Sequence, residues 1–344
     1  MDCRGGLMRA RVDDQQGIRW YLFEPCPTQT GPLSSRHPTF NQGGTDPLRT
    51  LIESIARLFA GILFAFIDAR WFRAMCRPLI RLLSLNRDTE FVVEGQRMYA
   101  RRMDKVALVL LYKFRANEYF ERLLLEKVCQ PGMTVADIGA HLGYFTLGLA
   151  RRVGPHGKVH AFEPDPANVT LLTKAVQANA LTNVELHAAA VAETAGTCRL
   201  YLCEENAGDN RIYDSGDGRP FIDVQTVALD QLLRGQKVDV VKMDIQGAET
   251  KALRGMKNLL AAHPDILVLS EFSPSLISKS GDQPEDFLNQ MSDLGFDFFF
   301  VDSSRQKLLR IERKKLLDVR SSHKDFNLLF ARTLPPELQP FLQP

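Results

Sequence analysis

Two carboxylates flank a glycine-rich turn in the middle of this sequence. Residues 134–146 read Thr-Val-Ala-Asp-Ile-Gly-Ala-His-Leu-Gly-Tyr-Phe-Thr, where an apolar run contains Asp137 and ends in a turn from Gly139 to Gly143. An amphipathic stretch follows, so the segment predicts a strand, a tight turn and a helix, the opening unit of a nucleotide-binding α/β sheet. The next predicted strand ends at Glu163, 20 residues beyond Gly143. Sheets of this kind place a carboxylate on the ribose hydroxyls at that point.

The position of Asp137 indicates which nucleotide ligand the turn accepts. A dinucleotide-binding turn reads G-x-G-x-x-G and places a pyrophosphate on the helix N-terminus. Here Asp137 takes the place of the first glycine, and Gly139 and Gly143 lie four apart. A carboxylate repels a pyrophosphate but suits a ligand with ammonium and sulfonium groups, such as S-adenosylmethionine. The alternative is an ordinary βαβ unit with solvated acids at its strand ends. Because both acids surround one glycine turn, we favour the ligand site, with Asp137 facing the methionine portion, and therefore methyl transfer.

A second cluster of ionisable side chains occupies residues 240–249, which read Val-Val-Lys-Met-Asp-Ile-Gln-Gly-Ala-Glu. Lys242 and Asp244 are two apart at the end of a predicted strand, so their side chains leave the same face. Ligands of open α/β sheets bind beyond the carboxyl ends of the strands, which brings this turn beside Asp137. An acid and an ammonium held together there orient a hydroxyl and assist removal of its proton. Asp244, Lys242 and Glu249, which begins the next helix, are therefore the catalytic candidates. A structural Lys–Asp pair is the alternative, and for Lys242 and Glu249 both interpretations stay open.

Three further residues are candidates for contact with a substrate. Glu271 ends another strand at the same sheet edge, His141 sits inside the glycine turn, and Asn210 lies in a long polar loop. Binding residues concentrate on such loops. Each has an alternative interpretation. Glu271 would be a surface or capping acid, His141 a turn residue over the sheet edge, and Asn210 part of an exposed loop. The other histidines stand in no metal-ligand spacing, and nothing in the sequence requires a metal. They are His37, His156, His160, His187, His263 and His323.

Composition limits the partners of the chain. It has 344 residues, 45% of them hydrophobic and 24% charged, and a formal net charge of +2. This ordinary globular mixture gives no reason to expect a nucleic acid as partner, so a small-molecule or glycan acceptor is expected. The six cysteines are scattered without a C-x-x-C pair. This pattern favours a reduced, zinc-free, cytoplasmic protein.

From residue 86 onward the hydrophobic pattern alternates between strands and helices. Short hairpins are expected at 91–93 with 96–100 and at 197–203 with 221–227. Buried strands are expected at 135–138, 159–163, 184–188, 238–243 and 266–271. Helices are expected at 117–129, 144–153, 166–180, 248–262 and 284–294. Residues 296–301 and 326–331 are expected to close the domain as antiparallel edge strands. Strands alternating with helices in this way predict a doubly wound α/β sheet.

The N-terminal region has a different character. Residues 1–49 are rich in Gly, Pro, Thr, Gln and Ser and are expected to be irregular or disordered. Residues 50–85 carry apolar side chains at helical spacing and five arginines, four of them between 70 and 81, but the uncharged run 58–67 is too short to span a bilayer. Such an amphipathic helical extension is compatible with a peripheral membrane contact. We favour the alternative, a helix docked on the catalytic domain or on a second subunit, and the sequence leaves the oligomeric state open.

Several segments between residues 117 and 303 resemble the FkbM family of S-adenosylmethionine-dependent methyltransferases. They are Asn117-Glu118, 135–146, 161–164, 224–230, 242–249 and 270–274, and their order and spacing match as well as their letters. The resemblance implies a Rossmann-like class I methyltransferase fold, here a seven-stranded sheet in residues 86–334 with a C-terminal tail at 335–344. It also implies O-methylation of sugars or secondary metabolites.

The resemblance assigns roles to individual residues. It implies cofactor contacts for Asp137, Gly139, Gly143 and Glu163, to which we add Ala140 and Thr146 from the same segment, and a position near the substrate for Asp244. Gln246 departs from the family, since many relatives carry Glu there, and this puts a carboxylate general base at that position in doubt. The expected function is S-adenosylmethionine-dependent O-methylation of a sugar, glycan, glycolipid or secondary metabolite. The alternatives are a catalytically silent binding or scaffold protein and a nicotinamide-dependent oxidoreductase.

Overall fold

The computed structural model describes residues 8–13, 17–22, 88–100, 118–203, 207–318 and 325–343. The chain divides into two compact units, one of Met1–Arg9 with Trp20–Asn86 and the other of Ala10–Arg19 with Arg87–Pro344. Strands β1 (Met8–Asp13) and β2 (Gly17–Leu22) pair with each other, whereas the sequence predicts irregular structure throughout 1–49. The expected helical extension at 50–85 lies outside the described residues.

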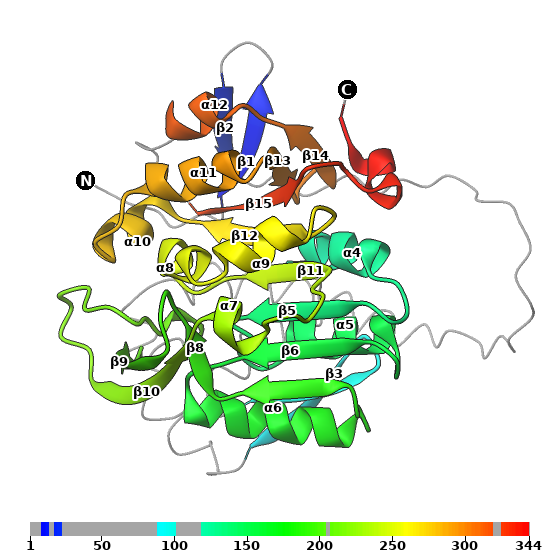
Figure 1. Cartoon of the computed structure of the whole chain (residues 1–344), viewed down its shortest axis with the longest axis vertical. Helices are drawn as coiled ribbons and strands as arrows, with labels where there is room; N and C mark the ends of the chain where they lie inside the picture. The colour runs from blue at the N-terminus through cyan, green and yellow to red at the C-terminus, as the bar shows by residue number, and fades with distance from the viewer. Residues whose placement is uncertain are drawn as a thin grey trace, which may run out of the picture. The chain divides into compact units, whose positions relative to one another are not determined.

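An eight-stranded sheet forms the body of the second unit. Its five parallel strands follow the spatial order β12 (Leu267–Phe272), β11 (Val240–Met243), β5 (Thr134–Ile138), β6 (Lys158–Phe162) and β7 (Val184–His187). Figure 1 shows β12, β11, β5 and β6 stacked in this order. Beyond β12 the sheet continues with antiparallel strands β15 (Phe326–Ala331), β13 (Asp297–Asp302) and β14 (Lys307–Arg310). Parallel strands share one direction, so the loops that follow β5, β6, β11 and β12 gather at one edge.

Helices connect the parallel strands and bury them, as expected for a doubly wound sheet. All four residues of β11 are buried, and so are the last four of β5. The helices are α4 (Tyr119–Val128), α5 (Tyr144–Val153), α6 (Pro166–Ala178), α7 (Leu229–Leu232), α8 (Glu249–Arg254), α9 (Lys257–Ala262), α10 (Pro274–Lys279), α11 (Pro284–Asp293) and α12 (Arg313–Asp318). The main hydrophobic core joins α4 and α5 to Val135, Val159, Val240 and Leu267, one residue from each of four adjacent strands.

Two smaller β structures flank the main sheet, and both hairpins predicted from the sequence are present. Strands β3 (Thr89–Val93) and β4 (Gln96–Ala100) turn at Glu94 and Gly95, which both have positive φ, as a two-residue hairpin turn requires. Strands β9 (Gly196–Tyr201) and β10 (Phe221–Val227) pair antiparallel, and β8 (Ala189–Val191) adds in parallel to β10. A short 3-10 helix, Ala207–Asp209, lies in the loop between β9 and β10.

Three elements differ from the sequence prediction. The single helix expected at 248–262 is split into α8 and α9 at Gly255, where an added Cβ would lie 2.0 Å from the backbone oxygen of Ala192. The strands expected at the edge, β13 and β15, lie inside the sheet because β14 forms the edge beyond them. The expected C-terminal tail packs on the domain through a 3-10 helix, Pro336–Phe341, whose Leu338 is completely buried. No helix within the described ranges is long and apolar enough to cross a membrane.

Candidate active site

An open cavity of about 340 Å³ lies at the carboxyl ends of β5, β6, β11 and β12. Its volume is in the range typical of small-molecule sites, roughly 300–1,000 Å³. The position is the one where open α/β sheets bind their ligands. Eight of the residues selected from the sequence line this cavity, namely Gly139, Ala140, His141, Glu163, Asn210, Lys242, Asp244 and Glu271. The other four, Asp137, Gly143, Thr146 and Glu249, are not among its lining residues.

The glycine turn and the loop after β11 are in direct backbone contact. Gly139 has φ 80°, and a Cβ on it would lie 2.0 Å from the backbone oxygen of Asp244. The Asp244 amide donates to the Ile138 carbonyl at 3.0 Å. The amides of Gly139 and Ala140 both donate to the Phe162 carbonyl, at 3.0 and 2.9 Å. Glycine is therefore required at 139, and the two loops predicted to be neighbours are held together.

Asp137 lies beneath the turn instead of facing a ligand directly. Its side chain is fully buried, and the Thr146 hydroxyl donates to Asp137 Oδ2 at 2.5 Å. Oδ1 lies 3.8 Å from the Lys242 ammonium and accepts no hydrogen bond within the described part of the chain. Burial raises the pKa of Asp137, while the charge of Lys242 opposes the rise. Asp137 and Thr146 thus connect β5 to α5 and to Lys242, one layer below the cavity.

Gly143 shapes the start of α5. It precedes the first helical residue, Tyr144, with φ 92°, a left-handed conformation that glycine adopts without strain. A Cβ at this position would lie 2.4 Å from Leu172 Cδ1 on α6. The second glycine of the turn is therefore explained by helix geometry and by packing between α5 and α6.

Lys242 forms the cationic floor of the cavity. Its ammonium donates to the Gly139 carbonyl at 3.1 Å and lies 5.0 Å from the centre of the Phe145 ring. Burial acts to lower the pKa of Lys242, but the negative charges of Asp137 and Asp244 outweigh burial and raise it. The side chain therefore stays charged, and it joins the glycine turn to the acids around it.

Glu163 is positioned by hydrogen bonds at the end of β6. Its Oε2 accepts from the His141 amide at 2.9 Å, and its Oε1 accepts from the Asp165 amide at 2.9 Å and from Asn168 Nδ2 at 3.3 Å. Burial raises the pKa of Glu163 to about 7, although these bonds favour its charged form. Burial also lowers the pKa of His141 to about 4, so its ring is neutral at pH 7. The carboxylate is held in a fixed orientation at the cavity wall.

Glu249 supports a loop and does not reach the cavity. It is fully buried, and its Oε1 accepts from the amides of Ile245 at 3.1 Å and Gly247 at 3.2 Å. These bonds fix the turn between β11 and α8. The structure thus places Glu249 as a positioning residue for Asp244 and Gln246, the other polar members of that turn.

Three acids gather at one end of the cavity, at residues 118, 244 and 271. Glu118, Asp244 and Glu271 line both the main cavity and a small pocket that adjoins it. Gln246 Nε2 donates to Asp244 Oδ1 at 2.8 Å and to Glu271 Oε2 at 3.1 Å. Desolvation and the charge of Asp244 raise the pKa of Glu118 to about 8. The same two causes raise the pKa of Glu271 well above its usual value.

Glu118 and Gln246 line the cavity, although the sequence analysis names them only in the family resemblance and assigns neither a place in the site. Both adopt left-handed backbone conformations, with φ 50° and 54°, which are uncommon for residues other than glycine. Glu118 immediately precedes α4, and no local pattern in the sequence brings that helix start to the sheet edge. Gln246 is placed by the Gly247 turn, and its backbone carbonyl also accepts a hydrogen bond from the Tyr213 hydroxyl at 2.9 Å.

The opposite side of the cavity is largely apolar. Residues lining it there come from the end of β6, from the small sheet and from the loop after β9, and include Phe162, Pro164, Ala190, Leu200 and Ile212. Asn210 also lines the cavity, while its Nδ2 donates to Asp165 Oδ2 at 3.1 Å and its Oδ1 accepts from the Cys203 amide at 2.8 Å. An apolar wall next to Glu163 suits an aromatic base attached to a ribose.

Two histidines that are far apart in the sequence meet in the structure. His160 and His187 lie beside Glu185, outside the cavity. Pairing between β6 and β7 brings them together across 27 positions of the chain. Spacing along the sequence does not reveal such a contact, because it depends on the register of two strands.

The fold and the site define a Rossmann-like class I methyltransferase that uses S-adenosylmethionine. Two features are typical of this class. The doubly wound sheet contains β15 antiparallel beside β12, and the glycine turn lies next to Glu163, the acid that follows β6. Residues 137–298, a little under half of the chain, match the model of the methyltransferase FkbM domain. The nicotinamide-dependent alternative is thereby set aside.

Two curated proteins are similar to this chain over part of its length. Methyltransferase sdnD of Sordaria araneosa is 24% identical over 203 residues, which cover 49% of this chain and 76% of that protein. Methyltransferase 1 of Beauveria bassiana (strain ARSEF 2860) is 22% identical over 144 residues, covering 36% of this chain and 57% of that protein. Both similarities are distant, so they support the class of reaction and leave the acceptor undetermined.

Solved methyltransferase structures resemble the fold only loosely. TYW2 of M. jannaschii, in complex with AdoMet, has a TM-score of 0.40 and 16% identity, and the match covers 73% of this chain and 89% of the TYW2 chain. Precorrin-6y C5,15-methyltransferase of Geobacter metallireducens GS-15 has a TM-score of 0.35 and 12% identity, and the match covers 62% of this chain and 87% of that chain. No inference about the site of this chain is drawn from them.

Proposed function

We propose that the protein transfers the methyl group of S-adenosylmethionine to a hydroxyl oxygen of a sugar, glycan, glycolipid or secondary metabolite. The observation that carries this proposal is the group of three acids, Glu118, Asp244 and Glu271, at one end of the cavity. Carboxyl groups form hydrogen bonds with hydroxyl groups, as acceptors when they are ionised and as donors when they are protonated. A neutral acceptor rich in hydroxyl groups fits this environment.

The residues that line the cavity would hold the cofactor beside the acceptor. Glu163 would accept hydrogen bonds from the ribose hydroxyls, and the apolar wall that includes Phe162 would contact the base. The bound cofactor would supply an electrophilic methyl group to the acceptor oxygen and would leave as S-adenosylhomocysteine. Holding both reactants near attack distance supplies much of the acceleration.

The acceptor proton passes to the acid group. Asp244 orients the hydroxyl and accepts its proton. Burial and the charge of Asp244 raise the pKa of Glu118 to about 8 and that of Glu271 well above its usual value, so these two neighbours favour their protonated form and can donate hydrogen bonds to the acceptor. Gln246 cannot act as a base, but it holds Asp244 and Glu271 by hydrogen bonds from its amide. The absence of a carboxylate at 246 is thus compensated by two neighbours.

A methyl-transfer screen tests the proposal. The full chain is incubated with methyl-labelled S-adenosylmethionine and with pools of neutral sugars, glycolipids and cell-extract metabolites, and products are analysed by mass spectrometry and NMR. We expect a methyl ether on a neutral, hydroxyl-bearing product. A product methylated on nitrogen or carbon would overturn the assignment to oxygen while leaving the methyltransferase class intact.

A further inference from the structure

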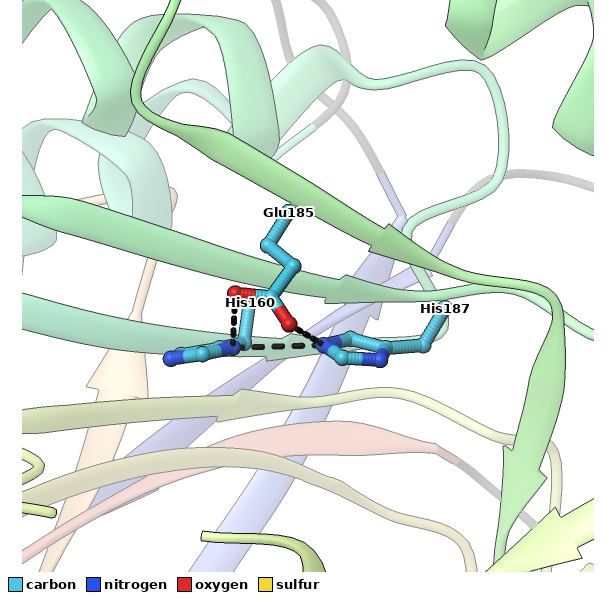
Figure 2. A group of neighbouring side chains, drawn as sticks. All are labelled: His160, Glu185 and His187. Atoms are coloured by element: carbon cyan, nitrogen blue, oxygen red, sulfur yellow. Dashed lines mark hydrogen bonds and ion pairs between the residues drawn. The ribbon is translucent and has the colours of Figure 1, made fainter.

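Outside the cavity, three side chains of metal-binding type converge on the outer strands of the sheet. Glu185 and His187 are two apart on β7, and His160 on β6 is paired in register with Glu185. All three therefore leave the same face. Figure 2 shows the two imidazole rings meeting nitrogen to nitrogen, with the carboxylate of Glu185 directed at the gap between them.

The spacing of the polar atoms fits a single bound ion. His160 Nδ1 lies 3.2 Å from His187 Nε2. Glu185 Oε2 lies 3.7 Å from the His160 nitrogen, and Glu185 Oε1 lies 3.7 Å from the His187 nitrogen. Two ligands held at about 2.1 Å from a tetrahedral ion are roughly 3.4 Å apart. Within the described residues, no other three His, Cys, Asp or Glu side chains bring their ligand atoms this close.

Burial prepares the two histidines for coordination. The His160 side chain is 1% exposed and that of His187 is 15% exposed, whereas Glu185 is 49% exposed. Burial lowers the pKa of both imidazoles, and a neutral ring is the form that binds a metal. The buried rings provide the inner wall of a site, and the half-exposed carboxylate provides its entrance.

Lys158 offers an ordinary structural explanation of the same cluster. Its ammonium donates to Glu185 Oε2 at 3.1 Å, and a hydrogen bond between the two rings would complete the group. However, Lys158 and Glu185 are each 49% exposed, and ion pairs of this kind contribute little to stability. A lysine on the surface can turn into solvent when a cation of higher charge binds the carboxylate.

We propose that His160, Glu185 and His187 form a binding site for a divalent transition-metal ion of the zinc class. Imidazole nitrogen suits Zn²⁺ and its neighbours in the first transition series, and two histidines with one glutamate are an established ligand set for Zn²⁺. Three protein ligands leave a fourth position to water. The sequence predicts no metal for this chain, so the site would be an addition to the methyltransferase function.

The ion would stabilise the part of the sheet that carries the cofactor-binding acid. The Glu163 amide donates to the His187 carbonyl at 3.1 Å, and the Phe162 ring stacks on the His187 ring at 4.5 Å between centres. None of the three proposed ligands lines the cavity. The ion therefore holds β6 to β7 next to Glu163 and takes no part in the transfer itself.

Metal titration of the full chain tests the site. Chelator-treated protein is titrated with ZnCl₂ by calorimetry, and Co²⁺ is used as a spectroscopic probe of the ligand set. We expect one site whose affinity for Zn²⁺ falls at least ~100-fold in Glu185→Gln, since loss of an outer-shell partner alone costs about 10–100-fold. Glu185→Gln keeps the shape of a half-exposed side chain, so the fold should survive. The visible bands of bound Co²⁺ should disappear in the same variant.

Two matched variants separate this site from other ligands in the chain. His156→Gln removes an exposed histidine just before β6 and should leave Zn²⁺ affinity unchanged. Lys158→Met removes the competing ammonium and should strengthen binding about two- to fivefold. If Glu185→Gln binds Zn²⁺ as tightly as the unaltered chain, or if the unaltered chain binds none, the proposal is overturned.

Discussion

Four glutamates at the site have raised pKa values, and two different surroundings cause the rise. Glu163 and Glu249 each accept hydrogen bonds from backbone amides, and burial raises the pKa of each to about 7. Glu118 and Glu271 are raised by burial and by the charge of Asp244. Glu163 and Glu249 are therefore suited to holding the loops in place, and Glu118 and Glu271 to exchanging a proton.

The raised pKa of Glu163 also links the stability of the ligand-free protein to pH. The stability that Glu163 contributes is fully present below pH ~4.5 and is lost as the pH rises through about 7.

Cofactor affinity should depend on the ionisation of Glu163. Ribose hydroxyls donate to a carboxylate, so binding requires the charged form, and with a pKa of about 7 only about one tenth of Glu163 is ionised at pH 6. S-adenosylhomocysteine should therefore bind several-fold to about tenfold more tightly at pH 8 than at pH 6. Calorimetry at three pH values measures this change. Glu163→Gln should abolish it, and an equal pH dependence in both proteins would show that another group is responsible.

Asp244 should matter for turnover and little for cofactor binding. Asp244→Asn keeps the shape of the side chain but removes the charge that orients the acceptor. Turnover of the acceptor found in the screen should fall at least ~100-fold, while affinity for S-adenosylhomocysteine stays nearly constant. Asp214→Asn, an exposed aspartate, serves as the control. Unaltered turnover in Asp244→Asn would make Asp244 a structural residue of the strand end.

At the scale of elements, the site depends on close contact between two loops. The glycine turn after β5 meets the loop after β11 with no room for a side chain at Gly139. Backbone bonds from Asp244 to Ile138 and from Ala140 to Phe162 extend this contact across three strands. The cavity floor is therefore fixed by the sheet, and an added side chain at this contact should directly change ligand binding.

Alanine substitutions at two glycines with similar φ distinguish a steric clash with the neighbouring loop from backbone strain alone. Gly139 and Gly132 have φ 80° and 90°, so alanine at either costs about 1–2 kcal/mol of conformational strain. A Cβ at Gly132 meets no atom within 4 Å, whereas one at Gly139 would lie 2.0 Å from the Asp244 oxygen. Thermal unfolding should show both variants destabilised, and calorimetry should show loss of S-adenosylhomocysteine binding in Gly139→Ala alone. Retained binding in Gly139→Ala would show that the loops do not define the cavity floor.

Local signals explain which elements were predictable. The parallel strands and both hairpins follow from apolar runs and turn residues, as at Glu94 and Gly95. The break between α8 and α9 depends on the approach of Ala192 to Gly255, and the inner position of β15 depends on strand β14 beyond it. These are tertiary contacts, which local periodicity does not encode.

The same distinction holds for the site. Gly139, Glu163, Lys242 and Asp244 were recognised because they follow or end strands at one edge. Asp137 lies inside β5, where it accepts a hydrogen bond from Thr146 of α5 and is fully buried, so it stays below the cavity. Glu118 belongs to one of the segments that resemble the FkbM family, but no role was assigned to it, because its position at the sheet edge depends on how α4 packs against the sheet.

At the scale of the whole molecule, the described body gives little reason to expect membrane contact. Its exposed large hydrophobic side chains are Val92, Phe221 and Leu232, from β3, β10 and α7. Single exposed residues of this kind are normal for a folded protein. An interfacial contact through the segment 51–83, which has arginines and apolar residues at helical spacing, stays a prediction.

Charge removal in that segment distinguishes its two interpretations. Four arginines, Arg70, Arg73, Arg77 and Arg81, are replaced by Gln in the full chain. If the segment lies on a membrane, the unaltered chain should co-sediment with anionic liposomes, less so at higher salt, and the variant should not, since each basic residue contributes about 1 kcal/mol near such a surface. A docked helix, which we favour, predicts no sedimentation of either protein.

The central claim is that the cavity beside Gly139 and Glu163 is an S-adenosylmethionine site. Its most direct test is calorimetric titration of the full chain with S-adenosylhomocysteine, NAD and NADP in parallel. We predict one S-adenosylhomocysteine per chain, no binding of either dinucleotide, and a loss of about 1–3 kcal/mol in Glu163→Ala, the range for leaving buried polar partners unsatisfied. Tight binding of a nicotinamide dinucleotide with no binding of S-adenosylhomocysteine would contradict the account.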